Sequence, residues 1–173
     1  MRSATGDRAQ GVIGVPDDYQ KRKVLFVCTA NVCRSPMAEA IFGALAEEMD
    51  VACEPCSAGT AALVDEPIAS SARAALEEIG VYPDRHRARQ VDGAMLEEAD
   101  LVLAMTPQHA AALRRLSESS RSKVHTLLGY ASGVPDSEGV PDPYGQSMTA
   151  HRASVRQLFE SISVLVERLG RER

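Results

Sequence analysis

Two cysteines and an arginine lie close together in the stretch VCTANVCRSP, where Arg34 directly follows Cys33 and comes six residues after Cys28. A planar guanidinium group can hold two phosphate oxygens at once. A cationic neighbour also favours the ionised form of a thiol, which is the nucleophilic form. Such residues together can bind a phosphate group and attack it. Cys28 is therefore a candidate nucleophile, and Arg34 is a candidate phosphate clamp.

The residues around this turn predict a strand, a tight loop and a helix. Residues 24–27 form a short apolar run typical of a buried strand, and Pro36 marks a helix start. A loop between a strand and a helix directs its N–H groups at an anion, helped by the helix dipole. Asn31 tolerates a left-handed backbone, and the Ser35 hydroxyl can donate to a thiolate. Buried structural cysteines are the alternative interpretation, because the spacing alone is weak.

Strands and helices are predicted to alternate along the rest of the chain. We expect further strands at residues 51–57, 101–105 and 123–128. We expect helices at about residues 35–45, 70–79, 107–116 and 155–169, with a loop at 129–145. This pattern predicts a single α/β domain over residues 23–173, with a four-stranded parallel sheet and helices on both faces. Residues 1–22 show no sustained hydrophobic period, and this absence predicts a mobile N-terminal extension.

Composition narrows the possible partners and the cellular compartment. The net charge of −5 argues against nucleic acid or an anionic membrane as the main partner, because both attract a basic surface. The chain has no apolar run near the roughly 20 residues that cross a bilayer, and residues 1–23 lack the apolar stretch of a secretory signal. The four cysteines are too few for a disulfide scaffold. We therefore expect a cytoplasmic protein with reduced thiols; its oligomeric state is not predicted.

Residues 28–36 resemble the signature of the low-molecular-weight protein tyrosine phosphatases. Four more motifs fall in that family's order and spacing, namely SAGT (57–60), HRARQ (86–90), ADLVLAM (99–105) and DPYG (142–145). The resemblance covers about residues 23–170. It implies a phosphatase acting on phosphorylated proteins through a phosphocysteine at Cys28, with Arg34 as the phosphate clamp and Asp142 as the general acid.

The resemblance also implies two groups of supporting residues. The hydrogen-bond network that holds the loop in shape matches Asn31, Ser35, Ser57 and His86. The substrate-binding residues are expected to be Thr29, Ala30, Asn31, Val32, Cys33, Ser35 and Tyr144. No metal or other cofactor is expected, because an arginine and loop amides can carry the phosphate charge, and the histidines show no ligand spacing.

Asp142 and the remaining cysteines need separate consideration. Asp142 precedes a proline, which favours a loop, but residue chemistry alone does not prefer it to Asp136; the resemblance selects it. Cys33 could trap an oxidised Cys28 as a reversible disulfide, or could simply fill the loop. The pair in CEPC, Cys53 and Cys56, lies three residues apart on a predicted strand, so the two thiols should pack on opposite faces instead of sharing a metal.

The substrate is predicted from departures from the tyrosine-directed pattern. The chain has no Trp, residues 61–64 are aliphatic, and Tyr144 is the single aromatic of DPYG, all features that resemble the bacterial branch that includes protein arginine phosphatases. The resemblance to that branch implies Thr at the loop position where this chain has Val32. Valine has nearly the same shape but no hydroxyl, and its apolar side chain suits the ring of a tyrosine. Phosphotyrosine is the predicted substrate, with phosphoarginine as the alternative. Two further alternatives are an arsenate reductase, which would need cysteines after Cys56, and a non-catalytic phosphate-binding module.

Overall fold

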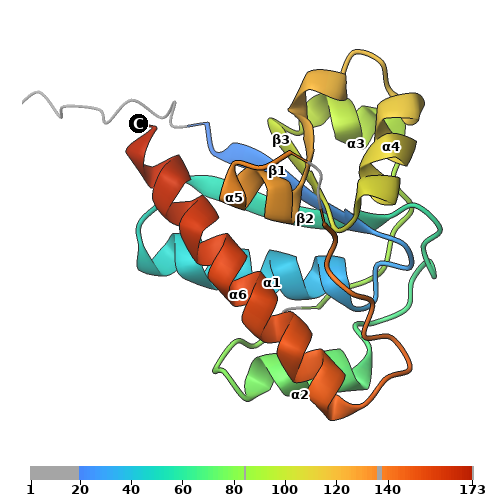
Figure 1. The fold of residues 1–173 in the computed structure, drawn as a ribbon, viewed down its shortest axis with the longest axis vertical. Helices are drawn as coiled ribbons and strands as arrows, with labels where there is room; N and C mark the ends of the chain where they lie inside the picture. The colour runs from blue at the N-terminus through green and yellow to red at the C-terminus, as the bar shows by residue number, and fades with distance from the viewer. Residues whose placement is uncertain (1–19, 84, 136–137, 173) are drawn as a thin grey trace, which may run out of the picture.

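A four-stranded sheet organises the protein, whose computed structural model describes residues 20–83, 85–135 and 138–172 (Figure 1). Its strands are β1 (Arg22–Cys28), β2 (Cys53–Gly59), β3 (Leu101–Ala104) and β4 (Val124–Thr126). They lie in the order β2-β1-β3-β4, and all three neighbouring pairs are parallel. The predicted four-stranded parallel sheet is confirmed.

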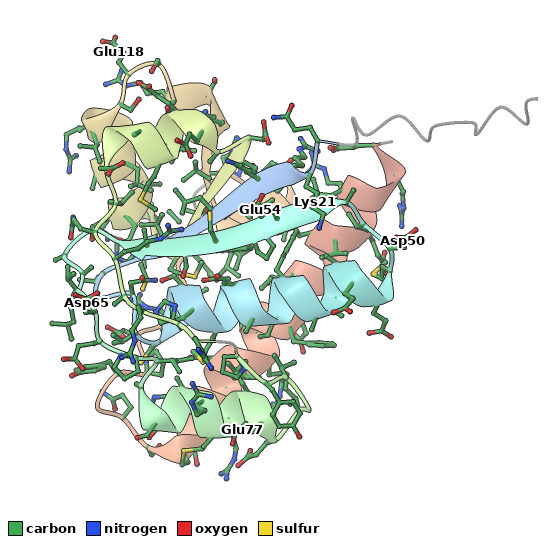
Figure 2. All side chains as sticks on the ribbon, turned by 180° about the vertical axis from the view of Figure 1, so that it is seen from behind. Lys21, Asp50, Glu54, Asp65, Glu77 and Glu118 are labelled. Atoms are coloured by element: carbon green, nitrogen blue, oxygen red, sulfur yellow. The ribbon has the colours of Figure 1, made fainter. Side chains whose placement is uncertain are left out.

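Helices cover both faces of this sheet, as predicted. One face carries α1 (Arg34–Glu48), α2 (Ser70–Glu77), α5 (Leu127–Ser132) and α6 (Met148–Arg171). The other face carries α3 (Gly93–Glu98) and α4 (Pro107–Leu116), and a short 3-10 helix, η1 (Arg121–Lys123), precedes β4. Figure 2 shows the same layers from behind, with β2 at the near edge of the sheet. A search of the described helices finds none with the length and apolar character of a membrane span.

Strand β1 supplies the centre of the core on both faces. Val24 and Phe26 pack with α1 and α6, whereas Leu25 and Val27 pack with α3 and α4, and all four side chains are fully buried. This alternation follows from the two-residue period of a strand. The continuous apolar run is thus explained by a central strand that is buried on both faces.

Several boundaries differ from the predicted ones. Strand β1 starts at Arg22, inside the predicted N-terminal extension, whose residues 1–19 lie outside the described residues. Strand β2 runs from Cys53 to Gly59 instead of 51–57. Helix α6 begins at Met148, because Ser147 caps it by accepting from the Ala150 N–H, well before the first apolar residue of the predicted helix.

The prediction at residues 123–128 was wrong at its end, and two helices, α5 and α3, were not predicted. Thr126 ends β4 and caps α5, accepting a hydrogen bond from the Gly129 N–H, so residues 127–132 are helical instead of strand and loop. Helix α3 was not predicted, because it has six residues and buries only Leu96, too little to give a visible period.

The order of the strands places the loop after β1 beside the loop after β3. The connection from β1 to β2 and the connection from β3 to β4 run in opposite directions across the sheet. The chain therefore leaves β1 and β3 toward opposite faces of the sheet. Ligands of open parallel sheets bind at such a switch point, at the carboxyl ends of the strands. Cys28 is the last residue of β1, so the candidate nucleophile lies at this point.

Candidate active site

Residues 28–34, here called the cysteine loop, connect β1 to α1. The carbonyl groups of the loop are bound from behind: those of Cys28, Thr29, Ala30 and Val32 accept hydrogen bonds of 2.8–3.1 Å from the backbone N–H groups of Thr60, Ala61, Leu63 and Ala69. Within the part of the chain that the structure describes, the N–H groups of residues 30–34 bond to no protein acceptor. These N–H groups and the N-terminus of the 15-residue helix α1 therefore have the arrangement that favours an anion.

Gly59 explains why the SAGT motif can lie so close to this loop. A Cβ atom added at Gly59 would come within 2.3 Å of the Thr29 carbonyl oxygen, which is far inside a van der Waals contact. The absence of a side chain thus allows the end of β2 to approach the cysteine loop and bind its carbonyl groups.

Asn31 lies at the centre of the hydrogen-bond network beneath the loop. It is fully buried and has a φ of 58°, the left-handed conformation that Asn tolerates. Its Nδ2 donates to the hydroxyls of Ser35 (2.8 Å) and Ser57 (3.0 Å), and its Oδ1 accepts from the Arg89 N–H (3.0 Å). The Ser35 hydroxyl lies 2.9 Å from the Cys28 sulfur. Because Asn31 donates to the Ser35 oxygen, the Ser35 hydrogen is left for one of two acceptors, the Cys28 sulfur at 2.9 Å or the Ala58 carbonyl oxygen at 3.4 Å, and the sulfur is the nearer.

Two side chains hold this network from outside. His86 Nε2 donates to the Asn31 carbonyl oxygen at 2.7 Å, which agrees with its predicted position in the network. The Ser57 hydroxyl donates to the carboxylate of Glu39, a residue that the sequence analysis missed. Glu39 lies four residues after Ser35 in α1 and so on the same helix face, which is the one sequence signal that could have indicated it.

The Arg34 guanidinium connects the cysteine loop to the segment that carries Asp142. Arg34 is 5% exposed; its Nη1 donates to the Val140 carbonyl oxygen (3.2 Å), and its Nη2 lies 3.3 Å from Asp142 Oδ2. The Val140 N–H in turn donates to the carbonyl of Met105, the residue after β3 (2.8 Å). Asp142 is thereby held above Arg34 with half of its side chain exposed. Asp136, the other candidate acid, lies outside the described residues.

A pocket of about 190 Å³ brings most of the predicted site residues together. Its lining consists of Cys28, Thr29, Ala30, Val32, Cys33, Arg34, Asp142 and Tyr144. Asn31 and Ser35 are buried beneath this lining, and Ser57 and His86 support it from behind through Asn31. Tyr144 is 56% exposed.

The other cysteines fall into distinct environments. Burial, reinforced by the charge of Asp142, raises the pKa of the Cys33 thiol to about 12, so Cys33 is a neutral thiol at physiological pH. Cys53 packs against the core on the α1 face, whereas Cys56 packs on the opposite face, as the strand alternation predicted. Among the described residues, no group of three or more His, Cys, Asp and Glu side chains could hold a metal ion.

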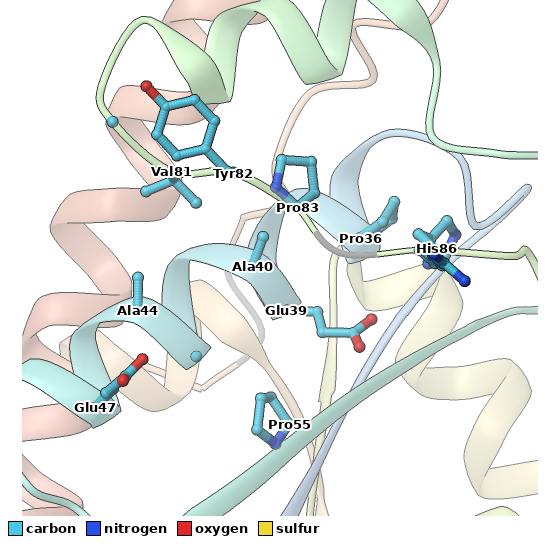
Figure 3. A pocket seen from close by; sticks show the side chains of 13 residues that line it. Pro36, Glu39, Ala40, Ala44, Glu47, Pro55, Val81, Tyr82, Pro83 and His86 are labelled. Carbon is cyan, nitrogen blue, oxygen red and sulfur yellow. The ribbon is translucent and has the colours of Figure 1, made fainter.

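A larger cavity of about 540 Å³ lies behind the cysteine loop, between α1, β2 and the segment after α2 (Figure 3). Glu39, Glu47, Pro55, Tyr82 and His86 are among its lining residues, and Cys28 is not. The cavity therefore lacks the nucleophile. Its Glu39 and His86 nevertheless reach the cysteine loop through Ser57 and Asn31.

Comparison with known proteins agrees with this geometry. Residues 23–173 match the family model of the low molecular weight phosphotyrosine protein phosphatases. A protein-arginine-phosphatase of Bacillus subtilis is 36% identical over 151 residues, covering 87% of this chain and 98% of the relative. A low molecular weight protein-tyrosine-phosphatase of Streptomyces coelicolor is 41% identical over 128 residues, covering 70% of this chain and 77% of the relative.

A solved structure extends this agreement to three dimensions. The YwlE arginine phosphatase, as a Cys-to-Ser mutant with a phosphorylated active-site serine, matches with a TM-score of 0.83 and 34% identity. The match covers 87% of this chain and 97% of that chain. The chain is therefore a protein phosphatase and belongs to the low molecular weight phosphotyrosine protein phosphatase family.

Proposed function

We propose that the protein hydrolyses phosphotyrosine in phosphorylated proteins, with Cys28 as nucleophile, Arg34 as phosphate clamp and Asp142 as general acid. The observation that carries this proposal is the convergence of these three side chains on one pocket of about 190 Å³ beneath the loop N–H groups. Cys28 lies at the end of β1, six residues before Arg34, where α1 begins, and the nucleophilic form of a cysteine is the thiolate. The Ser35 hydroxyl, 2.9 Å from the sulfur, stabilises that thiolate.

The first chemical step transfers the phosphoryl group to Cys28. The thiolate attacks phosphorus and forms the S–P bond while the P–O bond to the tyrosine oxygen breaks, and Asp142 gives that oxygen its proton. Arg34 and the loop N–H groups hold the equatorial phosphate oxygens. The Arg34 fork lies 3.3 Å from Asp142, so the phosphate clamp and the general acid are adjacent.

The second step releases phosphate. Asp142, now a carboxylate, accepts a proton from a water molecule whose oxygen attacks the phosphocysteine, and the S–P bond breaks to return the Cys28 thiolate. The exposed half of the Asp142 side chain gives water access to this position. The catalytic groups of both steps come from the protein, and no metal is part of the proposal.

The preference for phosphotyrosine rests on Val32 and Tyr144. Val32 is 4% exposed and belongs to the pocket lining, and its apolar side chain suits a ring and offers no hydrogen bond to a guanidinium group. Tyr144, 56% exposed in the same lining, offers an aromatic face. One missing hydrogen bond is worth about 0.5–1.5 kcal/mol, so the preference should be modest.

Phosphoarginine is the second candidate substrate, supported by the Bacillus subtilis relative that is named as a protein-arginine-phosphatase. The test is kcat/KM on matched phosphotyrosine and phosphoarginine peptides, for the natural protein and for Val32→Thr. We expect the natural protein to favour phosphotyrosine, and the threonine variant to shift the ratio toward phosphoarginine by roughly threefold to tenfold. If the natural protein already favours phosphoarginine, or the ratio does not move, the arginine assignment replaces this one.

We also propose that the protein acts in the cytoplasm. All four cysteines carry thiols in this structure, including the candidate nucleophile, and thiols persist in a reducing compartment.

A further inference from the structure

His109 is a buried histidine beside the pocket to which the proposed mechanism gives no role. It lies in the first turn of α4, just after β3, and is 7% exposed. Its Nε2 lies 2.7 Å from the Thr29 hydroxyl oxygen, and its Nδ1 lies 2.9 Å from the Thr106 hydroxyl oxygen. The imidazole therefore joins the two loops that leave the sheet at the switch point, and it contacts the residue next to the nucleophile.

The ring is neutral, so its two nitrogens differ. Burial, together with the charge of Arg34, lowers the pKa of His109 to about 4. A neutral imidazole carries one hydrogen, which makes one nitrogen a donor and the other an acceptor. The hydrogen bonds of the two threonines must therefore have opposite directions, one hydroxyl donating to the ring and the other accepting from it.

Thr106 decides this direction. It is the N-cap of α4, and its hydroxyl oxygen already accepts a hydrogen bond from the His109 backbone N–H at 3.2 Å. If this oxygen also accepted from Nδ1, the Thr106 hydrogen would have no acceptor among the described residues, whereas donation to Nδ1 uses every polar group of the cap. Nε2 then carries the ring hydrogen and donates it to the Thr29 oxygen. The hydrogen of the Thr29 hydroxyl is directed away from the ring.

Thr29 is exposed and lines the same pocket as Cys28 and Arg34. We propose that His109 is a positioning residue, which directs the Thr29 hydroxyl hydrogen into the pocket so that Thr29 donates to a phosphate oxygen. The opposite tautomer would present a Thr29 lone pair to the ionised oxygens of the phosphate group, which can only accept, and would weaken phosphate binding. The inference uses the phosphate-binding part of the proposed function and does not depend on which phosphorylated residue is cleaved.

The first measurement is the tautomer of His109 in the natural protein, read from the nitrogen-15 chemical shifts of the imidazole in long-range nitrogen–proton NMR spectra. The spectra should be recorded at pH 7, with and without inorganic phosphate. We expect Nε2 to be the protonated nitrogen in both states. A hydrogen on Nδ1 overturns the proposal, and this measurement needs no variant and no turnover.

The second measurement is the affinity for inorganic phosphate by calorimetry, which is independent of catalysis. Thr29→Val and His109→Phe should each weaken binding by roughly tenfold, since each removes or misdirects one hydrogen bond to a charged group. His109→Gln keeps an N–H donor toward Thr29 and should retain most of the affinity. The matched control is His151→Phe, which removes another buried histidine, one that bonds to the Ser147 carbonyl at the start of α6. It should leave phosphate affinity unchanged.

The double variant Thr29→Val with His109→Phe separates positioning from a general structural role. If His109 acts through Thr29, the double variant should bind phosphate no more weakly than Thr29→Val alone. Additive losses in the double variant would overturn the proposal, as would unchanged phosphate affinity in His109→Phe. A chain that binds phosphate as described here but does not turn over any phosphorylated peptide would contradict the proposed function and leave this inference intact.

Discussion

The cysteine loop and the segment that carries Asp142 meet at Arg34, but the fold holds them in different ways. Every residue from Asn31 to Arg34 is buried, and hydrogen bonds from behind fix the loop carbonyls. In the other segment, Val140 is buried and bonded to Met105, whereas Asp142 and Tyr144 are half exposed. The part that would bind phosphate is thus preorganised, and the part that would meet the leaving group is open to solvent. This difference predicts that changes in the loop affect every substrate, whereas changes around Asp142 depend on the leaving group.

The largest effect is expected for Cys28→Ser. An alcohol is far less ionised than a thiol, so turnover of para-nitrophenyl phosphate should be abolished. The loop N–H groups and Arg34 remain, so inorganic phosphate should still bind with an affinity within a few-fold of that of the natural protein. Phosphate release together with calorimetry checks both parts. Activity that survives in this variant would disprove the assigned nucleophile.

Asp142→Ala should produce the next largest effect, and one that depends on the substrate. General acid catalysis contributes about 10²- to 10⁴-fold, and it matters most when the leaving group is a poor one. We expect losses in this range for phenyl phosphate and a much smaller loss for para-nitrophenyl phosphate, whose phenolate departs without a proton. The measurement is kcat/KM for a series of aryl phosphates with leaving groups of different pKa. This ratio reports the transfer of the phosphoryl group to Cys28, whereas kcat also contains the hydrolysis step, which Asp142 assists for every substrate alike. Equal losses across the series would point to another acid, with Asp136 as the next variant to make.

Glu39→Gln tests the support behind the cysteine loop. The change keeps the shape of the side chain but removes the charge that accepts the Ser57 hydrogen, so Ser57 and Asn31 can reorient. A hydrogen bond to a charged group contributes about 1.5–3 kcal/mol, and we expect kcat/KM to fall by roughly tenfold or more for all aryl phosphates alike. Glu47→Gln is the matched control, because Glu47 lies two turns further along α1 and lines the same cavity. Equal effects of the two changes would show that the cavity charge, and not the Ser57 contact, is responsible.

The two regions also differ in how well the sequence predicted them. Cys28, Asn31 and Arg34 lie within seven residues, and a strand, a turn and a helix start are local features, so their placement in one loop could be anticipated. The position of Asp142 above Arg34 could be anticipated only from the family resemblance. It depends on the hydrogen bond between Arg34 and the buried Val140, which lie more than 100 residues apart along the chain. His109 and Glu39 were missed for the same reason, since their partners Thr29 and Ser57 come from other elements. Local caps such as Thr126 and Asp92 decided the element boundaries that periodicity placed wrongly or missed.

The smallest effect concerns oxidation of the cysteine loop. Mild peroxide should convert the Cys28 thiolate to a sulfenic acid, and attack by the Cys33 sulfur should then form a disulfide and release water. The attacking species is the Cys33 thiolate, and burial raises the pKa of Cys33 to about 12, so only a minute fraction of it is ionised at pH 7. That fraction rises about tenfold for each pH unit below this pKa. The disulfide should therefore form slowly at pH 7 and faster at pH 8.5, and a reductant should restore activity.

The measurement is peptide mapping by mass spectrometry, at a fixed peroxide concentration and at both pH values. We expect the share of Cys28 recovered as the Cys33 disulfide, relative to irreversibly oxidised Cys28, to be larger at pH 8.5. Cys33→Ser is the control, and in this variant oxidation of Cys28 should become irreversible at both pH values. Finding Cys28 joined to Cys53 or Cys56, or irreversibly oxidised while Cys33 stays a thiol at both pH values, would contradict the role of Cys33. Cys33 belongs to the preorganised loop. Irreversible oxidation of Cys28 beside an intact Cys33 thiol would therefore mean that the rigidity that favours phosphate binding also keeps the two sulfur atoms from reacting.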